Sequence, residues 1–363
     1  MSPKIFLGIV FLSLSSIFLI NSAFAQTSSF TTSGESDDPN DNMHVVINTE
    51  GHSQTLDIPL SQVLFKMVPH YDATGVSSYN TIELRPDMKS FYSQVGFPSP
   101  SNKAVFVYPI FTQAAYGNSG FYDYYKKTCG ERCLTVPIPD QIQGGYSSSF
   151  KTASVLTLLN YSHITDVDID KNPDILKKYD RVIILHSEYV TKKEFDAITA
   201  HPNVIFLFPN ALYAEVKTNY DNNTITLVRG HGYPDYNVRN GFDWKYDNSK
   251  YEYDTLCNNW TYYSKASYAM INCYPEYKIL YTPEMLVLLQ HADPTQLIED
   301  TANWLRYQND AHYAHALLAD YDINGTYIPQ WMANPAQWII DGEMKKSEFL
   351  QVLDYLYKNN IVR

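Results

Sequence analysis

The chain has 363 residues, enough for one large hydrophobic core with smaller appendages. Its formal net charge is -12 at pH 7, only 18% of its residues are charged, and 31 are tyrosines. An acidic chain of this kind lacks the positive surface that nucleic acid or an anionic membrane would attract, so we exclude both as partners.

The first 25 residues have the three parts of a secretory signal peptide. Lys4 gives the positive start, residues 5–20 form the apolar stretch, and residues 23–25 form an Ala-x-Ala cleavage site. An uncleaved membrane anchor is the alternative, but the apolar stretch is short for a spanning helix. We therefore expect a secreted or extracellular protein that is not membrane-spanning. Residues 26–42 have almost no apolar side chains and are expected to form a flexible lead.

Residues 43–323 are predicted to form one α/β domain. Residues 43–103 contain short alternating apolar runs, which predict a small N-terminal extension with a few strands. Residues 104–228 alternate strand-like and helix-like segments. This alternation predicts a doubly wound, mostly parallel sheet, with the layers of a glutamine-amidotransferase or flavodoxin domain. Residues 229–323 add a tyrosine-rich loop and helices over residues 283–318.

The individual elements of the predicted core follow from runs of apolar residues and from helix-start signals. Thr191 and Glu194 form a capping-box pattern that starts one helix. The expected strands are residues 104–110, 164–169, 182–185, 204–208 and 224–228, and the other expected helices are residues 149–159 and 173–178.

The C-terminal segment, residues 324–363, has the pattern of a helical hairpin. Trp331, Trp338 and Ile339 lie at helical spacing, and so do the apolar residues from Phe349 to Leu356. The segment resembles a short module found at the ends of exported archaeal proteins, which implies association with the cell surface. A structural cap on the main domain is the alternative.

Two further patterns agree with a location outside the cytoplasm. The four cysteines form two local pairs, Cys129 with Cys133 and Cys257 with Cys273, which we predict to be disulfides. A metal site is the weaker interpretation, because neighbouring ligands are missing at the required spacing. Glycosylation sequons begin at Asn160, Asn222, Asn259 and Asn324.

Polar residues gather where two neighbouring strands of the predicted sheet end. His186 and Glu188 follow the apolar run at residues 182–185, and Asn210 follows the run at residues 204–208. Ligands of open α/β sheets sit outside the carboxyl ends of the strands, so a candidate active site lies at this edge. A hydrogen-bonded His186–Glu188 pair that fixes a loop is the alternative interpretation.

Four segments in this region carry a resemblance to a known family. They read TQAAYGNSGFYDYY, SSFKTASVLTLLNYSHITDVDID, ILKKYDRVIILHSEYVTKKEFDAI and NVIFLFPNALYAEV. In this order they resemble the C-terminal domain of the large (beta) subunit of N,N-dimethylformamidase, over residues 104–228. The resemblance implies a mononuclear iron held by two tyrosines and one glutamate, which activates water for the hydrolysis of an amide.

The resemblance implies a role for each matching residue. Tyr116 and Glu188 would be iron ligands, and His186 would carry a proton or orient a ligand. The second tyrosine has no clear match, and Tyr108 is predicted for it, with Tyr79 as the other candidate. Oxygen ligands of this kind suit Fe(III), which polarises an amide carbonyl and lowers the pKa of water.

Each of these residues also has a structural interpretation. In a chain so rich in tyrosine, Tyr116 could simply be a packing residue. His231, between Gly230 and Gly232, could reach the site, but it fits a turn residue better. Two functions therefore remain open. One is an exported, iron-dependent amidohydrolase that acts on small or peptide-like amides. The other is a non-catalytic cell-surface binding or structural protein that keeps the amidase-like fold.

Overall fold

The computed structural model describes residues 29–32, 42–49, 52–71, 77–142, 149–265 and 268–290, and isolated positions between 348 and 358. The expected signal peptide lies outside the described residues. So do residues 291–318 of the expected helices, and all of the expected C-terminal hairpin except those isolated positions.

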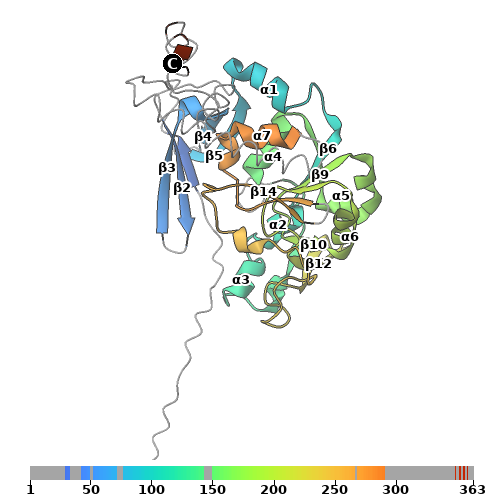
Figure 1. The fold of residues 1–363 in the computed structure, drawn as a ribbon. Helices are drawn as coiled ribbons and strands as arrows, with labels where there is room; N and C mark the ends of the chain where they lie inside the picture. Colours follow the sequence, from blue (N-terminus) through green and yellow to red (C-terminus); the bar gives the residue numbers. More distant parts are fainter. Residues whose placement is uncertain are drawn as a thin grey trace, which may run out of the picture.

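A six-stranded, mostly parallel sheet forms the centre of the molecule (Figure 1). Four of its five neighbouring pairs are parallel, and only the edge pair of β14 with β15 is antiparallel. The prediction of an α/β fold with a mostly parallel sheet is therefore confirmed. Across the sheet the strands are β14 (Tyr262–Lys265), β15 (Tyr268–Ile271), β11 (Val204–Phe206), β9 (Arg181–Ile184), β6 (Ser101–Tyr108) and β8 (Tyr161–Thr165).

The order of the parallel strands determines where a ligand can bind. Numbered along the chain, the five parallel strands lie in the order 2-1-3-4-5, with β6 as the first and β9 as the third. The connections leave β6 in one direction and β9 in the other. In sheets with this order, the crevice beside the carboxyl ends of these two strands is the usual ligand site.

Both faces of this sheet are buried, which explains the unbroken apolar runs in its strands. In β9, Ile183 packs into one apolar cluster, and Val182 and Ile184 pack into the other. The first cluster contains residues from α1 (Lys89–Val95), α4 (Phe150–Leu158) and α7 (Pro283–Gln290). The second contains residues from α5 (Asp166–Lys171), the 3-10 helix η4 (Pro173–Lys178) and α6 (Lys192–Ala200).

A second sheet lies beyond the carboxyl ends of the main strands. Its order is β10 (Tyr189–Thr191), β12 (Ala214–Asn219), β13 (Thr224–Arg229) and β7 (Thr135–Pro137). The strand expected at residues 224–228 therefore exists as β13. It belongs to this sheet and pairs antiparallel with β12 and β7.

Two boundaries differ from those expected. The segment at residues 164–169 was expected to be a strand, but β8 ends at Thr165 and α5 begins at Asp166. Thr165 caps α5, because its side chain accepts the N–H of Asp168 while the Asp168 carboxylate accepts the N–H of Thr165. Similarly, β6 ends at Tyr108, and the helix α2 (Ile110–Ala115) follows, then α3 (Phe121–Tyr125).

The N-terminal extension contains the expected strands, and one further strand lies in the segment before it. β2 (Asn42–Thr49) and β3 (His52–Pro59) form a hairpin, and β4 (Phe65–Tyr71) pairs with β5 (Ser77–Leu84). β1 (Ser29–Thr32) pairs antiparallel with β2. Four residues of the segment expected to be flexible are thus a strand, because main-chain pairing with β2 needs no apolar side chains.

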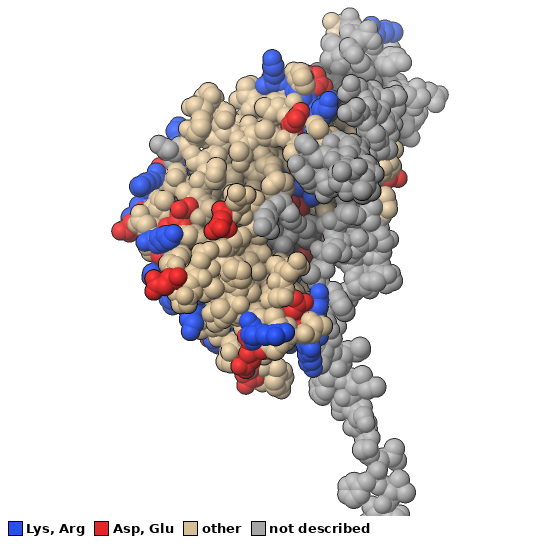
Figure 2. Space-filling view, turned by 180° about the vertical axis from the view of Figure 1, so that it is seen from behind, with Lys and Arg blue, Asp and Glu red and all other residues tan. Residues whose placement is uncertain are grey.

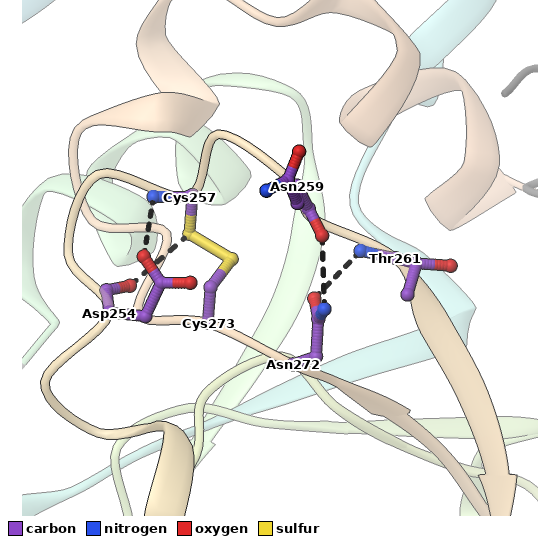
Figure 3. The surroundings of a disulfide bond; sticks show 6 residues. All are labelled: Asp254, Cys257, Asn259, Thr261, Asn272 and Cys273. Atoms are coloured by element: carbon purple, nitrogen blue, oxygen red, sulfur yellow. Dashed lines mark hydrogen bonds between the residues drawn. A yellow bond between two sulfur atoms is a disulfide. The ribbon is translucent and has the colours of Figure 1, made fainter.

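Both predicted disulfides are present. Cys129 is joined to Cys133 and Cys257 to Cys273, with Cα atoms 6.1 Å and 5.3 Å apart. Asp254 forms hydrogen bonds to both of the segments that the second disulfide joins, and Figure 3 shows the bond to Cys257. Its carboxylate accepts the N–H of Cys257, and its main-chain carbonyl accepts the N–H of Tyr274 at 2.8 Å.

Seen from behind, Lys and Arg side chains lie among Asp and Glu side chains along the left edge and the bottom of the described part (Figure 2). Within the described ranges, each helix is too short or too polar to cross a bilayer.

Candidate functional site

The candidate site lies where the order of the parallel strands reverses, between the ends of β6 and β9. The chain leaves β6 through α2 and α3, which carry Tyr116 at the end of α2 and Tyr122 within α3. It leaves β9 through a short turn that places Glu188 directly before β10. The two strand ends therefore present two phenols and one carboxylate to each other.

These three side chains form one compact group of oxygen atoms. The Tyr116 hydroxyl donates to Glu188 Oε2 at 2.8 Å. The Tyr122 hydroxyl lies 2.5 Å from the Tyr116 hydroxyl and 3.3 and 3.4 Å from the two carboxylate oxygens of Glu188. Glu188 has no exposed surface, and Tyr122 is only 6% exposed. The group is therefore shielded from bulk water.

Two histidines approach Glu188 from different segments. His231 Nε2 lies 3.4 Å from Glu188 Oε1 and 3.4 Å from the Tyr122 hydroxyl. His186 Nε2 lies 3.9 Å from Glu188 Oε2, which is longer than a hydrogen bond. The simple alternative, in which a His186–Glu188 hydrogen bond fixes the loop, therefore does not describe this contact.

A second carboxylate completes the group. Glu252, directly after the 3-10 helix η5 (Ser249–Tyr251), has its Oε1 atom 4.0 Å from His186 Nε2. One ligand atom each from His186, Glu188 and Glu252 lies within 4.8 Å of the others, close enough for all three to face one metal ion. Burial raises the pKa of both carboxyls, and hydrogen bonding by the Asn210 side chain offsets part of that rise in each.

Burial controls the protonation of the oxygen group. It raises the pKa of Glu188 from 4.5 to about 7. It also raises the pKa of Tyr116 and Tyr122 well above 10, with the negative charge of Glu188 as the second cause. A cation placed among these oxygens would oppose both effects and favour the ionised forms. Without a cation, the two phenols are therefore neutral.

The backbone around His231 explains how a turn residue reaches the site. Gly230 and Gly232 have positive φ angles of 117° and 81°. A Cβ atom at Gly230 would lie 2.9 Å from the Cα atom of Ala214, so the chain comes too close to β12 for a side chain there. The His231 ring stacks on Tyr125 with 4.3 Å between the ring centres. Burial lowers the pKa of His231 to about 4, so the ring is neutral.

The structure brings together four of the residues that the sequence suggested for this edge: Tyr116, His186, Glu188 and Asn210. It does not place Tyr108 with them as the second phenol. The Tyr108 hydroxyl lies 3.4 Å from Gln113 Oε1, and its ring lines an apolar pocket with Phe106 and Ile82. Tyr79 lies in β5, and its side chain is outside the described part. Tyr122 is a phenol whose hydroxyl contacts both Tyr116 and Glu188, and hydrogen bonding by Tyr189 also acts on the Glu188 carboxyl.

Sequence reasoning missed Tyr122 and Glu252, and it favoured a turn residue over a site residue for His231. Tyr122 lies inside the segment TQAAYGNSGFYDYY, but the choice among its tyrosines needs the turn between α2 and α3. His231 was interpreted as a turn residue, and it is one, yet the same turn carries its ring to Glu188. Glu252 lies in the tyrosine-rich loop, where no pattern in the sequence distinguishes it.

Comparison with models of known protein families finds no match for this chain, and comparison with curated proteins finds none either.

Proposed function

We propose that the protein is an exported amidohydrolase that uses a mononuclear iron and resembles N,N-dimethylformamidase in its core. The observation that carries the proposal is the buried oxygen group of Tyr116, Tyr122 and Glu188. Its composition of two phenols and one carboxylate is the ligand set that the family resemblance implies. Tyr122 takes the position for which the sequence left Tyr108 and Tyr79 as candidates.

The side chains of this group fit a ferric ion. Phenolate and carboxylate oxygens are hard ligands, which suit Fe(III) better than softer metals. The oxygens lie on one side of Glu188 and already stand 2.5 to 3.4 Å apart, so only small movements would turn them toward a common ion. When bound, the ion supplies Lewis acidity, which polarises an amide carbonyl and lowers the pKa of water.

His186 and Glu252 are the residues we assign to proton transfer. Hydrolysis forms a C–O bond from water to the carbonyl carbon and breaks the C–N bond, and the proton that water loses must reach the departing amine. Burial raises the pKa of Glu252 well above 4.5, so its carboxyl can carry a proton for the departing amine. His186 lies between Glu252 and Glu188, and the Tyr274 hydroxyl lies 3.3 Å from its Nδ1 atom. Tyr274 thus helps to orient the ring.

Two broader parts of the proposal concern the fold and the location. The strand order 2-1-3-4-5 supports a doubly wound sheet with flavodoxin-like layers. The two disulfides support an enzyme that is secreted or held at the cell surface, because disulfides persist in oxidising compartments. The C-terminal hairpin remains the predicted point of surface attachment, and a small amide the predicted substrate.

Iron content and the visible spectrum of the purified protein test the proposal. We expect about one iron per chain and a charge-transfer band from tyrosinate bound to Fe(III). Tyr122→Phe and Tyr116→Phe should each weaken the band and lower the hydrolysis of small amides. Tyr124→Phe is the matched control, because Tyr124 lies in the same helix and packs against Tyr125 and Tyr233.

A folded, colourless protein that binds no iron from a ferric solution would overturn the proposal. The non-catalytic cell-surface protein would then be the better interpretation. A band that survives Tyr122→Phe but not Tyr116→Phe would instead remove Tyr122 from the ligand set.

A further inference from the structure

The glycosylation sequons of the chain differ in their surroundings, and the difference separates sites that can carry a glycan from one that cannot. Three of them, beginning at Asn160, Asn222 and Asn259, lie in the described part. The fourth, at Asn324, is outside it. An N-linked glycan is bulky and hydrophilic, so its asparagine has to present its amide to solvent.

The sequon at Asn160 is turned into the protein. Asn160 is only partly exposed, and its side-chain amide donates to the carbonyl of Phe97 at 2.7 Å. The third residue, Ser162, donates its hydroxyl to the carbonyl of Ser101 at 2.5 Å. The Asn160 amide and the Ser162 hydroxyl therefore both fix the start of β8, and a sugar on Asn160 would break the hydrogen bond between Asn160 and Phe97.

The sequon at Asn222 is at the tip of the turn between β12 and β13. Asn219 holds this turn, because its side-chain oxygen accepts the N–H groups of Asp221 and Asn222 at 3.1 and 3.3 Å. Asn222 is exposed, and within the described residues its side-chain amide makes no hydrogen bond. The side-chain amide nitrogen of Asn222, to which a sugar would be attached, is thus presented on a fixed turn.

A polar groove runs beside Asn222. Its volume of about 660 Å³ is within the range of pockets that hold small ligands. Hydroxyl groups dominate its walls, with Thr218, Thr226 and Tyr220 among them. The Tyr220 hydroxyl donates to Asp170 at 2.7 Å, which holds its partly exposed ring in place. Hydroxyls and an aromatic ring are suitable neighbours for the first sugars of a glycan on Asn222.

The sequon at Asn259 is held by the disulfide between Cys257 and Cys273 (Figure 3). Asn272 donates to the main-chain carbonyl of Asn259 at 3.0 Å and accepts the N–H of Thr261 at 2.7 Å. These two bonds use the main chain of the sequon, and the Thr261 hydroxyl donates to the carbonyl of the next residue, Tyr262, at 3.2 Å. None of the three bonds involves the Asn259 side chain. The exposed Asn259 side chain points away from them in Figure 3.

We propose that the exported protein carries N-linked glycans on Asn222 and Asn259 and none on Asn160. The donor would be an oligosaccharide on an isoprenoid phosphate carrier. The asparagine nitrogen forms a bond to the first sugar carbon and loses one proton, and the bond from that carbon to the carrier phosphate breaks. The proposal is independent of iron binding and of amide hydrolysis.

Glycopeptide mass spectrometry of the full chain, secreted from a host that performs N-glycosylation, tests the proposal. We expect sugar on the peptides with Asn222 and Asn259 and an unmodified Asn160. Thr224→Ala and Thr261→Ala should each remove one glycan, whereas Thr224→Ser and Thr261→Ser keep the sequons and should keep the glycans. Asn258→Gln, at an exposed neighbour outside any sequon, should change nothing.

Sugar on Asn160 of the folded protein would overturn the assignment of that site. Bare Asn222 and Asn259 would overturn the rest, provided that a sequon-bearing control protein secreted by the same cells is glycosylated.

Discussion

At the scale of single residues, Glu188 links the site to stability. Burial raises its pKa to about 7 in the folded, metal-free protein, against an ordinary value of 4.5. Between these two values the folded chain binds more protons than the unfolded chain. The free energy of unfolding should therefore fall as the pH rises from about 4.5 to 7, and this contribution is fully present only below pH 4.5. Its size is at most about 3 kcal/mol, since one pKa unit corresponds to about 1.4 kcal/mol.

The substitution Glu188→Gln tests this loss of unfolding free energy at high pH, because glutamine keeps the shape of the side chain and cannot ionise. We expect the metal-free variant to be more stable than the natural protein at pH 8 by about 1–3 kcal/mol, and to lose iron binding. Denaturant unfolding at pH 5 and pH 8 measures the difference.

Glu276→Gln is the comparison, because burial also raises the pKa of Glu276 to about 7, away from the site. That variant should be stabilised at pH 8 and still bind iron. Equal pH dependence in the natural protein and Glu188→Gln would contradict the argument.

Gly230 is the residue on which the position of His231 depends. Alanine at this position combines a φ angle of 117° with a Cβ atom 2.9 Å from the Ala214 backbone. We expect Gly230→Ala to lower the free energy of unfolding by more than about 1 kcal/mol and to weaken iron binding, because the turn must move His231. Gly130→Ala is the control, since nothing lies within 4 Å of its added Cβ. Chemical unfolding and iron titration of both variants check this, and an unchanged Gly230→Ala protein would refute it.

The residues of the site show what a sequence can give and what it cannot. His186, Glu188 and Asn210 could be found because each follows a buried strand of one parallel sheet. Tyr116 needed the family resemblance in addition. Glu252 could not be found, because it reaches the site from a loop whose path depends on a disulfide and on contacts distant in sequence.

At the scale of elements, the capping of α6 supports the segment that carries Glu188. The Thr191 side chain accepts the N–H of Glu194 at 3.2 Å, and Thr191 is also the last residue of β10. We expect Thr191→Ala to cost about 1 kcal/mol of unfolding free energy, and Thr191→Ser to restore most of it. Thermal or denaturant unfolding of the two variants measures this. Equal losses in both would show that the methyl group matters and the hydroxyl does not.

The elements that the sequence missed are short or lack an apolar period. β7 and β10 have three residues each, too few for an alternation to be visible. The boundary between β8 and α5 depends on the cap at Thr165, where a polar residue interrupts an apolar run. The longer buried strands were predictable because both of their faces are covered.

At the scale of the whole molecule, the disulfide between Cys257 and Cys273 holds the last segments of the site. It joins residues 16 positions apart, and Glu252 and Tyr274 lie close to it on either side. Cys257→Ser with Cys273→Ser should lower the free energy of unfolding by about 3 kcal/mol and weaken iron binding. The Cys129–Cys133 bond closes a much shorter loop and should matter less when both of its cysteines are replaced. Unfolding midpoints and iron titration compare the two double variants, and the reverse ranking would contradict this prediction.

The spread of the site along the chain has a consequence for the order of events during maturation. Tyr116 and Tyr122 leave the ribosome long before Glu252 and Tyr274, and the two groups meet only when the residues around Cys257 and Cys273 have docked against β11. A half-finished chain can display the phenols but cannot enclose an ion among them. Metal binding would therefore require that synthesis and disulfide formation are complete, and an incomplete chain would not retain iron.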